Sequence, residues 1–134
     1  MTNSTSLDPA TDSSSVLAEL YASLPLTRGL IVVSADGRVL TAELEEAKQG
    51  AIAAVVASSF ALGAKLAQTV GDSPVDEMTV RTPDGIVSLY AVGHRAALAV
   101  MSMPDANVAL VHLRSREAAE QLAPLVEPLL AARS

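Results

Sequence analysis

The longest helical pattern in the chain, at about residues 45–70, separates side chains by size rather than by polarity. Between Lys48 and Asp72 it carries one charge, Lys65. At 3.6 residues per turn, one stripe holds the larger apolar residues: Ile52, Val55, Val56, Phe60, Leu62, Leu66 and Val70. A surface helix normally sets apolar residues against a charged back. We therefore predict that the large residues pack on the chain's own sheet and that the smaller side admits a partner at close range.

Alternating and β-branched runs predict five strands. Leu30–Val33 is a short buried strand, and Asp36-Gly37 after it is typical of a hairpin turn. The alternating residues 38–44 then form its antiparallel neighbour. Two turns separate three further strands, at residues 76–82, 86–92 and 96–103, the last being the most apolar and therefore central.

Helical patterns flank these strands. Ser13 or Ser14 is expected to cap a first helix that ends near Leu24, before Pro25. Residues 108–111 fit either a strand or the start of a helix capped by Asn107. The helix is preferred because its apolar stripe continues to Leu129, although Pro124 and Pro128 predict a kink or fraying near its end.

The resulting order, α-β-β-α-β-β-β-α, predicts one α+β domain: a five-stranded antiparallel sheet with helices on both faces. With 134 residues there is little room for a second domain. We expect a flexible tail over residues 1–12, the domain over 13–131 and a short tail over 132–134. The first twelve residues lack the apolar run of a secretory signal, and the weakly polar run 50–64 is too short to span a bilayer. No membrane insertion is predicted.

Composition removes several classes of function. Aromatic residues make up only 2% of the chain, which argues against a ligand pocket with aromatic walls. The net charge of −6 repels phosphate backbones, so nucleic-acid binding is not expected. The chain has no cysteine, which is compatible with a reducing cytosol and predicts a cytoplasmic protein.

The search for an active site finds almost nothing. His94 and His112 belong to no metal-binding spacing, and Glu45 and Glu46 are neighbours that point apart on a helix. There is neither a phosphate-binding loop nor a Gly-x-Ser-x-Gly elbow. We therefore predict no catalytic residue, no cofactor and no metal, and a protein that is not an enzyme.

Surfaces that bind a partner are the remaining candidates for a functional site. The alternative to a binding role for the long helix is an alanine-rich helix exposed to solvent, since alanine is the best helix former. Its near absence of charge over more than six turns favours contact instead. The half-polar strand 76–82 would suit pairing at a sheet edge. The predicted dimer or partner interface consists of Ala53, Ala54, Ala57, Ser58, Ala61, Ala64, Lys65, Gln68, Met78 and Val80.

The order of elements, the stretch from Gly29 to Leu40 with its Ser-Ala-Asp-Gly hairpin, and the run from Pro104 to Asn107 into a last helix resemble the roadblock/dynein light chain family. The resemblance covers about Val16 to Leu130. It implies a roadblock/profilin-like fold and a non-catalytic homodimer in which the second helices lie side by side and the third strands pair. Prokaryotic members regulate or scaffold small Ras-like GTPases, some of them alongside a sensor kinase, so the resemblance implies such a GTPase as partner.

Two other hypotheses remain at this point. A small-molecule-sensing α/β module has a similar arrangement of elements, but it needs an internal pocket. An unrecognised hydrolase needs convergent ionisable groups in a cleft, which the sequence does not supply.

Overall fold

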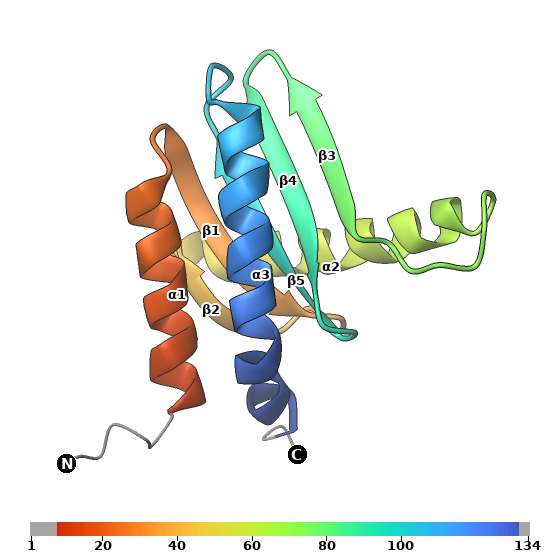
Figure 1. Cartoon of the computed structure of the whole chain (residues 1–134), viewed down its shortest axis with the longest axis horizontal. Helices are drawn as coiled ribbons and strands as arrows, with labels where there is room; N and C mark the ends of the chain where they lie inside the picture. The colour runs from red at the N-terminus through yellow and green to blue at the C-terminus, as the bar shows by residue number, and fades with distance from the viewer. Residues whose placement is uncertain (1–7, 132–134) are drawn as a thin grey trace.

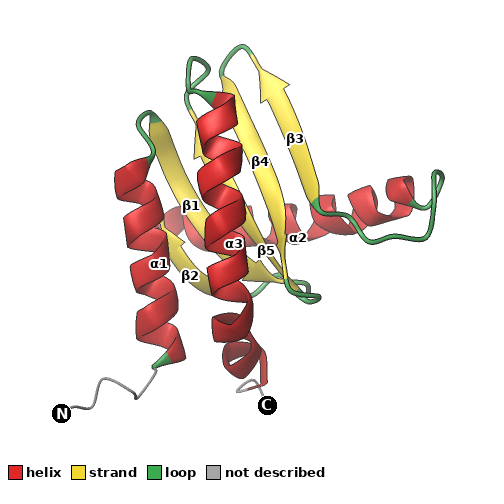
Figure 2. Cartoon of the chain, in the orientation of Figure 1, coloured by secondary structure: helices red, strands yellow, loops and turns green. Residues whose placement is uncertain are grey.

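A five-stranded antiparallel sheet separates two unequal layers of helices (Figures 1 and 2). The structure is a computed structural model that describes residues 8–131. Helices α1 (Pro9–Ser23) and α3 (Val108–Ala131) cover one face of the sheet, and α2 (Glu46–Ala67) crosses the other face alone. The predicted order of elements and the α+β fold are confirmed.

The strands follow the order β2-β1-β5-β4-β3, so the sheet has β5 at its centre, as predicted, and β2 and β3 at its edges. Every neighbouring pair is antiparallel. Their bounds are β1 Thr27–Ser34, β2 Val39–Glu43, β3 Glu77–Thr82, β4 Gly85–Val92 and β5 Ala96–Ser102.

Two hydrophobic cores lie on the two faces of this sheet. The larger one joins α1, α3 and the sheet, with Leu17, Leu98 and Leu122 fully buried. The smaller one lies between α2 and the sheet, around Ile31 and Val33. Because side chains alternate along a strand, β1 supplies Leu30 and Val32 to the first core and their neighbours to the second. This double burial explains the β-branched run seen in the sequence.

Helix α1 begins earlier than predicted, at Pro9. The side chain of Asp8 accepts a hydrogen bond from the Ala10 N–H at 3.2 Å, and proline suits the first helical position because its missing N–H would be unpaired there. Ser13 is buried inside the helix rather than capping it. The predicted tail therefore loses residues 9–12 to the helix, and the predictions for residues 1–7 and 132–134 lie outside the described residues.

The preference for a helix after residue 107 is confirmed. The Asn107 side chain accepts a hydrogen bond from the Leu110 N–H at 3.1 Å, which is an N-terminal cap. The helix continues through Pro124 and Pro128 to Ala131, so of the two predicted effects, a kink or fraying, fraying before Ala131 is wrong. Val126 and Leu130 are buried on the sheet side and hold these last turns in place.

Two glycines in α2, Gly50 and Gly63, give a matched test of how closely this helix packs on the sheet. Alanine at the open position 50 should stabilise the protein by up to about 1 kcal/mol through helix propensity. At Gly63 a Cβ would overlap the sulfur of Met78, so Gly63→Ala should stabilise less than Gly50→Ala, because the Met78 side chain must move aside. Chemical denaturation of both variants measures the difference. Equal stabilisation by Gly50→Ala and Gly63→Ala would contradict the contact.

Candidate functional site: the outer face of α2 and the edge of the sheet

Helix α2 touches its own sheet through a narrow strip in which small residues alternate with Ile52, Val56 and Phe60. Only Ala53, Val56 and Gly63 are buried on it, and Phe60 is half-buried. Gly63 lies directly over the Met78 side chain of β3. A helix can approach a sheet closely only where its side chains are small. Some of the small residues of α2 therefore face the sheet and are not accessible to a partner.

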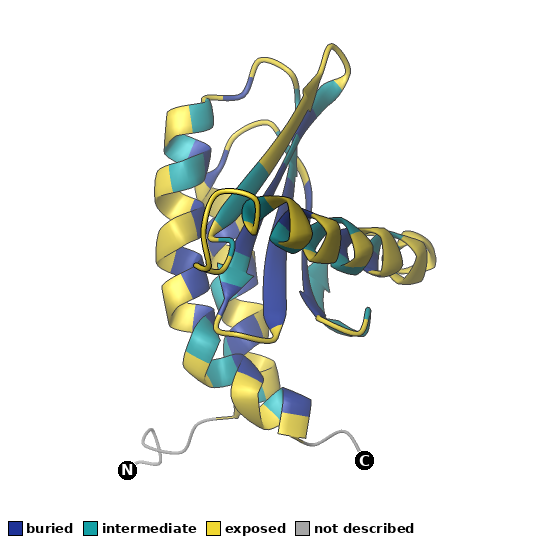
Figure 3. Ribbon diagram, turned by 90° about the vertical axis from the view of Figure 1, so that its right-hand side faces the viewer, coloured by how far each residue is buried: buried dark blue, intermediate teal, exposed yellow. Residues whose placement is uncertain are grey.

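The predicted orientation of the large residues is right for Ile52, Val56 and Phe60, which pack in the core under α2, and wrong for four others. Val55, Leu62, Leu66 and Val70 are 64%, 69%, 71% and 89% exposed. The spacing from position 55 to 62 and 66 places three of them on one side of the helix, and that side faces away from the sheet. In Figure 3 most of α2 is coloured as exposed or intermediate.

The predicted interface residues fall into three groups. Ala53 is fully buried against the sheet, so its assignment to a partner-facing surface is wrong. Ala57, Ala64 and Met78 are half-buried. The others lie on the outer face of α2 or on β3 and are exposed: Ala54, Ser58, Ala61, Lys65, Gln68 and Val80. The near absence of charge identified this face, whereas residue size did not show that its large residues belong to it.

The outer face of α2 is an exposed apolar surface of the kind that a partner usually buries. Within residues 8–131, α2 is the one helix that is long and apolar enough to cross a membrane. Its most apolar 18 residues have a mean hydropathy of 1.6, and 11% of these residues are buried. It is longer than the run 50–64 considered in the sequence. Exposed apolar surfaces of this extent mark protein or membrane interaction sites.

Strand β3 adds an open edge beside this helix. In the described part of the chain it pairs only with β4, from Glu77 opposite Tyr90 to Thr82 opposite Gly85. Four of its six residues are exposed, among them Val80 at 51%. Its free N–H and C=O groups can pair with another strand.

Two open grooves flank α2 where it crosses the sheet. One, of about 380 Å³, lies between Ala57, Phe60 and Ala61 of the helix and the turn at His94. The other, of about 350 Å³, lies between Ile52 and the end of the sheet formed by β3, β4 and β5. Both open at the surface, whereas the small-molecule hypothesis calls for an internal pocket.

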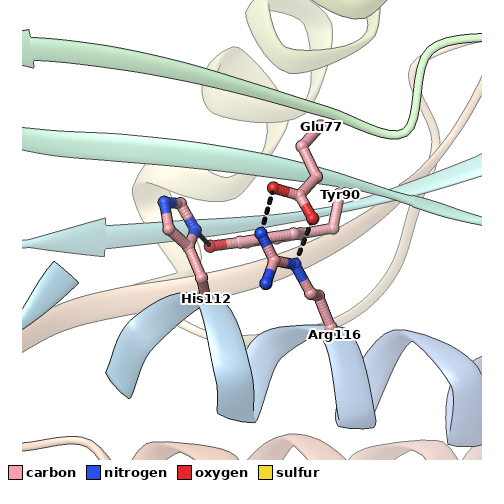
Figure 4. Close-up of polar contacts among 4 residues, drawn as sticks. All are labelled: Glu77, Tyr90, His112 and Arg116. Atoms are coloured by element: carbon pink, nitrogen blue, oxygen red, sulfur yellow. Dashed lines mark hydrogen bonds and ion pairs between the residues drawn. The ribbon is translucent and has the colours of Figure 1, made fainter. Parts of the chain in front are cut away.

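A group of polar side chains lies on the opposite face of the sheet, under α3 (Figure 4). The hydroxyl of Tyr90 is 2.7 Å from Nδ1 of His112, and burial raises the pKa of Tyr90. Arg116 forms a bidentate ion pair with Glu77, donating two hydrogen bonds, and thereby lowers the pKa of the Glu77 carboxyl. The Glu77 contact connects the first residue of β3 to α3, and the Tyr90 contact connects β4 to α3, so both contribute to structure.

The other ionisable residues do not converge on a cleft. Glu45 pairs with Lys48 on the surface, and Arg95 pairs with Glu127. Among the described residues, no group of three or more His, Asp or Glu side chains is placed to hold a metal ion. The site that the geometry supports is a contact surface.

Comparison with known proteins assigns this fold to a family. A family model described as the Roadblock/LC7 domain matches residues 15–102. The chain belongs to the Roadblock/LC7 family. No curated protein matches the sequence. The matched residues include α2 and β3, the two elements of the candidate surface.

Several solved structures share the fold. The chain is similar to "MglB with tetrameric arrangement" (23% identity, 92% of this chain and 93% of that chain covered, TM-score 0.83). It is also similar to gliding protein MglB from Thermus thermophilus (21%, 92% and 94%, TM-score 0.82) and to a Roadblock/LC7 domain from Streptomyces avermitilis (21%, 89% and 98%, TM-score 0.75). The predicted fold class is thereby confirmed.

The ion pair between Glu77 and Arg116 gives a pH-dependent prediction. Because the folded-state pKa of Glu77 is lowered, the pair stabilises the fold above the ordinary glutamate pKa, and this contribution is lost as pH falls through the lowered value. Arg116→Gln should therefore lower the free energy of unfolding at pH 7 but not in acid below that pKa. Arg114→Gln, which removes an exposed pair with Glu117, is the control. A pH-independent effect in urea denaturation would contradict this role.

Proposed function

We propose that this Roadblock/LC7 protein is a non-catalytic homodimer that regulates or scaffolds a small Ras-like GTPase. The observation that carries the proposal is the exposed apolar face of α2. The side chains of Leu62, Leu66 and Val70 are exposed to solvent in the single chain. Burying each side chain of this kind in an interface contributes about 1.5–3 kcal/mol of favourable free energy. A surface of this kind is stable when a partner covers it.

A second copy of the same chain suits this surface well. Helix α2, which carries the apolar face, crosses the edge strand β3 where Gly63 lies over Met78. A two-fold axis beside β3 would pair the edge strands and bring the two α2 helices together in one step, which makes the interface self-complementary. The family resemblance implies the same arrangement.

The GTPase is proposed from the family resemblance, and the surface supports a protein partner. The chain has no phosphate-binding loop of its own, so nucleotide chemistry would belong to the partner. Paired α2 helices would join into one continuous surface. The remaining exposed small residues, Ala54, Ser58 and Ala61, would leave room for a partner backbone to approach.

A pair of leucine variants tests the dimer. Leu66→Asp places a charge on the outer face of α2 and should raise the dimer dissociation constant at least about tenfold, or about 1.4 kcal/mol. Leu113→Asp, on exposed α3 surface, should leave it unchanged. Dilution calorimetry measures both constants.

Two results would contradict the homodimer. One is an equal effect of Leu66→Asp and Leu113→Asp. The other is co-flotation of the wild-type protein with zwitterionic lipid vesicles at concentrations where it does not self-associate, since a membrane would then be what covers α2.

The GTPase is tested with purified proteins. Small Ras-like GTPases from the same organism should bind the wild-type chain with an affinity that depends on GDP or a GTP analogue, and Leu66→Asp should weaken binding while Leu113→Asp should not. A changed rate of GTP hydrolysis would indicate a regulator, and an unchanged rate a scaffold. Failure of every such GTPase to bind in either nucleotide state would contradict the proposal.

A further inference from the structure

A group of buried hydroxyls lies on the α3 side of the sheet, within the larger core. Tyr90 of β4 is 1% exposed, and its hydroxyl contacts His112 of α3 (Figure 4). Ser88 lies two residues before Tyr90, on the same face of β4, and Ser115 lies about one helical turn after His112. Both serines are fully buried. Strand β4 and helix α3 thus each contribute a serine beside the contact between the two rings.

The two serines are close to the Tyr90 hydroxyl without being hydrogen-bonded. Burial raises the pKa of Tyr90, and the hydroxyls of Ser88 and Ser115 oppose that rise, which places both of them near the phenol oxygen. Among the described residues neither serine hydroxyl has a hydrogen-bond partner. Burying a hydroxyl without a partner is unfavourable, so two such groups beside a third polar group require an explanation.

His112 is the member of this group that titrates near neutral pH, because histidine changes its charge there. Tyr90 keeps its proton, since burial raises its pKa, and Glu77 stays ionised, since the hydrogen bonds from Arg116 lower its pKa. Glu77 of β3 and Arg116 of α3 are the charged groups beside His112 (Figure 4). A proton taken up by His112 therefore has to be accommodated by its hydrogen-bond partner, Tyr90.

Protonation reverses the hydrogen bond between the two rings. Neutral His112 accepts the Tyr90 O–H at Nδ1, across the 2.7 Å that separates the two atoms. A protonated imidazole carries a hydrogen on both nitrogens, so Nδ1 must then donate to the phenol oxygen. The Tyr90 O–H is left pointing into the core and needs another acceptor there.

We propose that Ser88 and Ser115 are alternative acceptors for the Tyr90 O–H, used when His112 is protonated. In the neutral state the Tyr90 O–H points at His112, and the phenol oxygen is free to accept from either serine. In the protonated state the Tyr90 O–H turns to one of the serine oxygens. His112 can thus change its charge while the contact between α3 and β4 is kept, which gives both buried serines a role.

Nitrogen NMR of the imidazole tests the reversal, because the Nδ1 chemical shift differs between an acceptor nitrogen and one that carries a hydrogen. The chain has two histidines, so His94→Gln, in an exposed turn, leaves the signal of His112 alone. Nδ1 should be an acceptor at about pH 8 and carry a hydrogen at about pH 5, on either side of histidine titration. A hydrogen already on Nδ1 at the higher pH, or an imidazole still neutral at the lower pH, would overturn the proposal.

Serine variants test the acceptors. With Ser88→Ala and Ser115→Ala combined, the Tyr90 O–H has no acceptor once His112 is protonated. The unfolding equilibrium constant of this variant relative to wild type, from urea denaturation, should therefore be higher at about pH 5 than at about pH 8 by about fivefold or more. Should the double variant not fold, each single variant is compared in the same way.

Ser102→Ala is the matched control. Ser102 of β5 is also buried and has no hydrogen-bond partner among the described residues, but it is not one of the hydroxyls that act on Tyr90. Its effect on stability should be the same at both pH values. An equal pH dependence of the control and of the Ser88 and Ser115 variants would overturn the proposal.

Discussion

The contact between Gly63 and Met78 determines how the second face of the sheet is organised. It sets the point at which α2 crosses the edge strand and the distance between helix and sheet. Because the helix is fixed there, its small buried residues lie inward and Leu62 and Leu66 point outward. The same crossing point leaves Val80 uncovered on one side and carries the end of α2 beyond the sheet. The candidate surface follows from this close approach together with the buried contacts of Ala53 and Val56.

The two faces of the sheet differ in how complete they are. Under α1 and α3 the core is closed, and the Glu77–Arg116 pair fastens the edge strand to α3. On the α2 side the core is smaller and its helix is mostly exposed. An apolar helix that remains in water lowers solubility and invites association. The closed face therefore acts as a rigid support, and the open face is where a partner gains the most free energy of burial.

The strands and their order along the chain could be predicted because β-branched runs, alternation and turn residues are local signals, and the central place of β5 followed from its apolarity. The orientation of α2 could not be predicted in the same way, because a helical wheel separates two faces without showing which face contacts the sheet. Small residues suit close packing on a sheet as well as on a partner, so Ala53 was placed outward although it is buried. The Asp8-Pro9 pair was a readable signal for the start of α1. The contact of Tyr90 with His112 depends on packing between distant elements and had no local signal.

The central claim is that a second copy covers the outer face of α2. Sedimentation equilibrium of the unmodified protein, over concentrations from below one to several tens of micromolar, tests it most directly. The account predicts a mass approaching twice 13.8 kDa as concentration rises. A single species of 13.8 kDa throughout that range would contradict it.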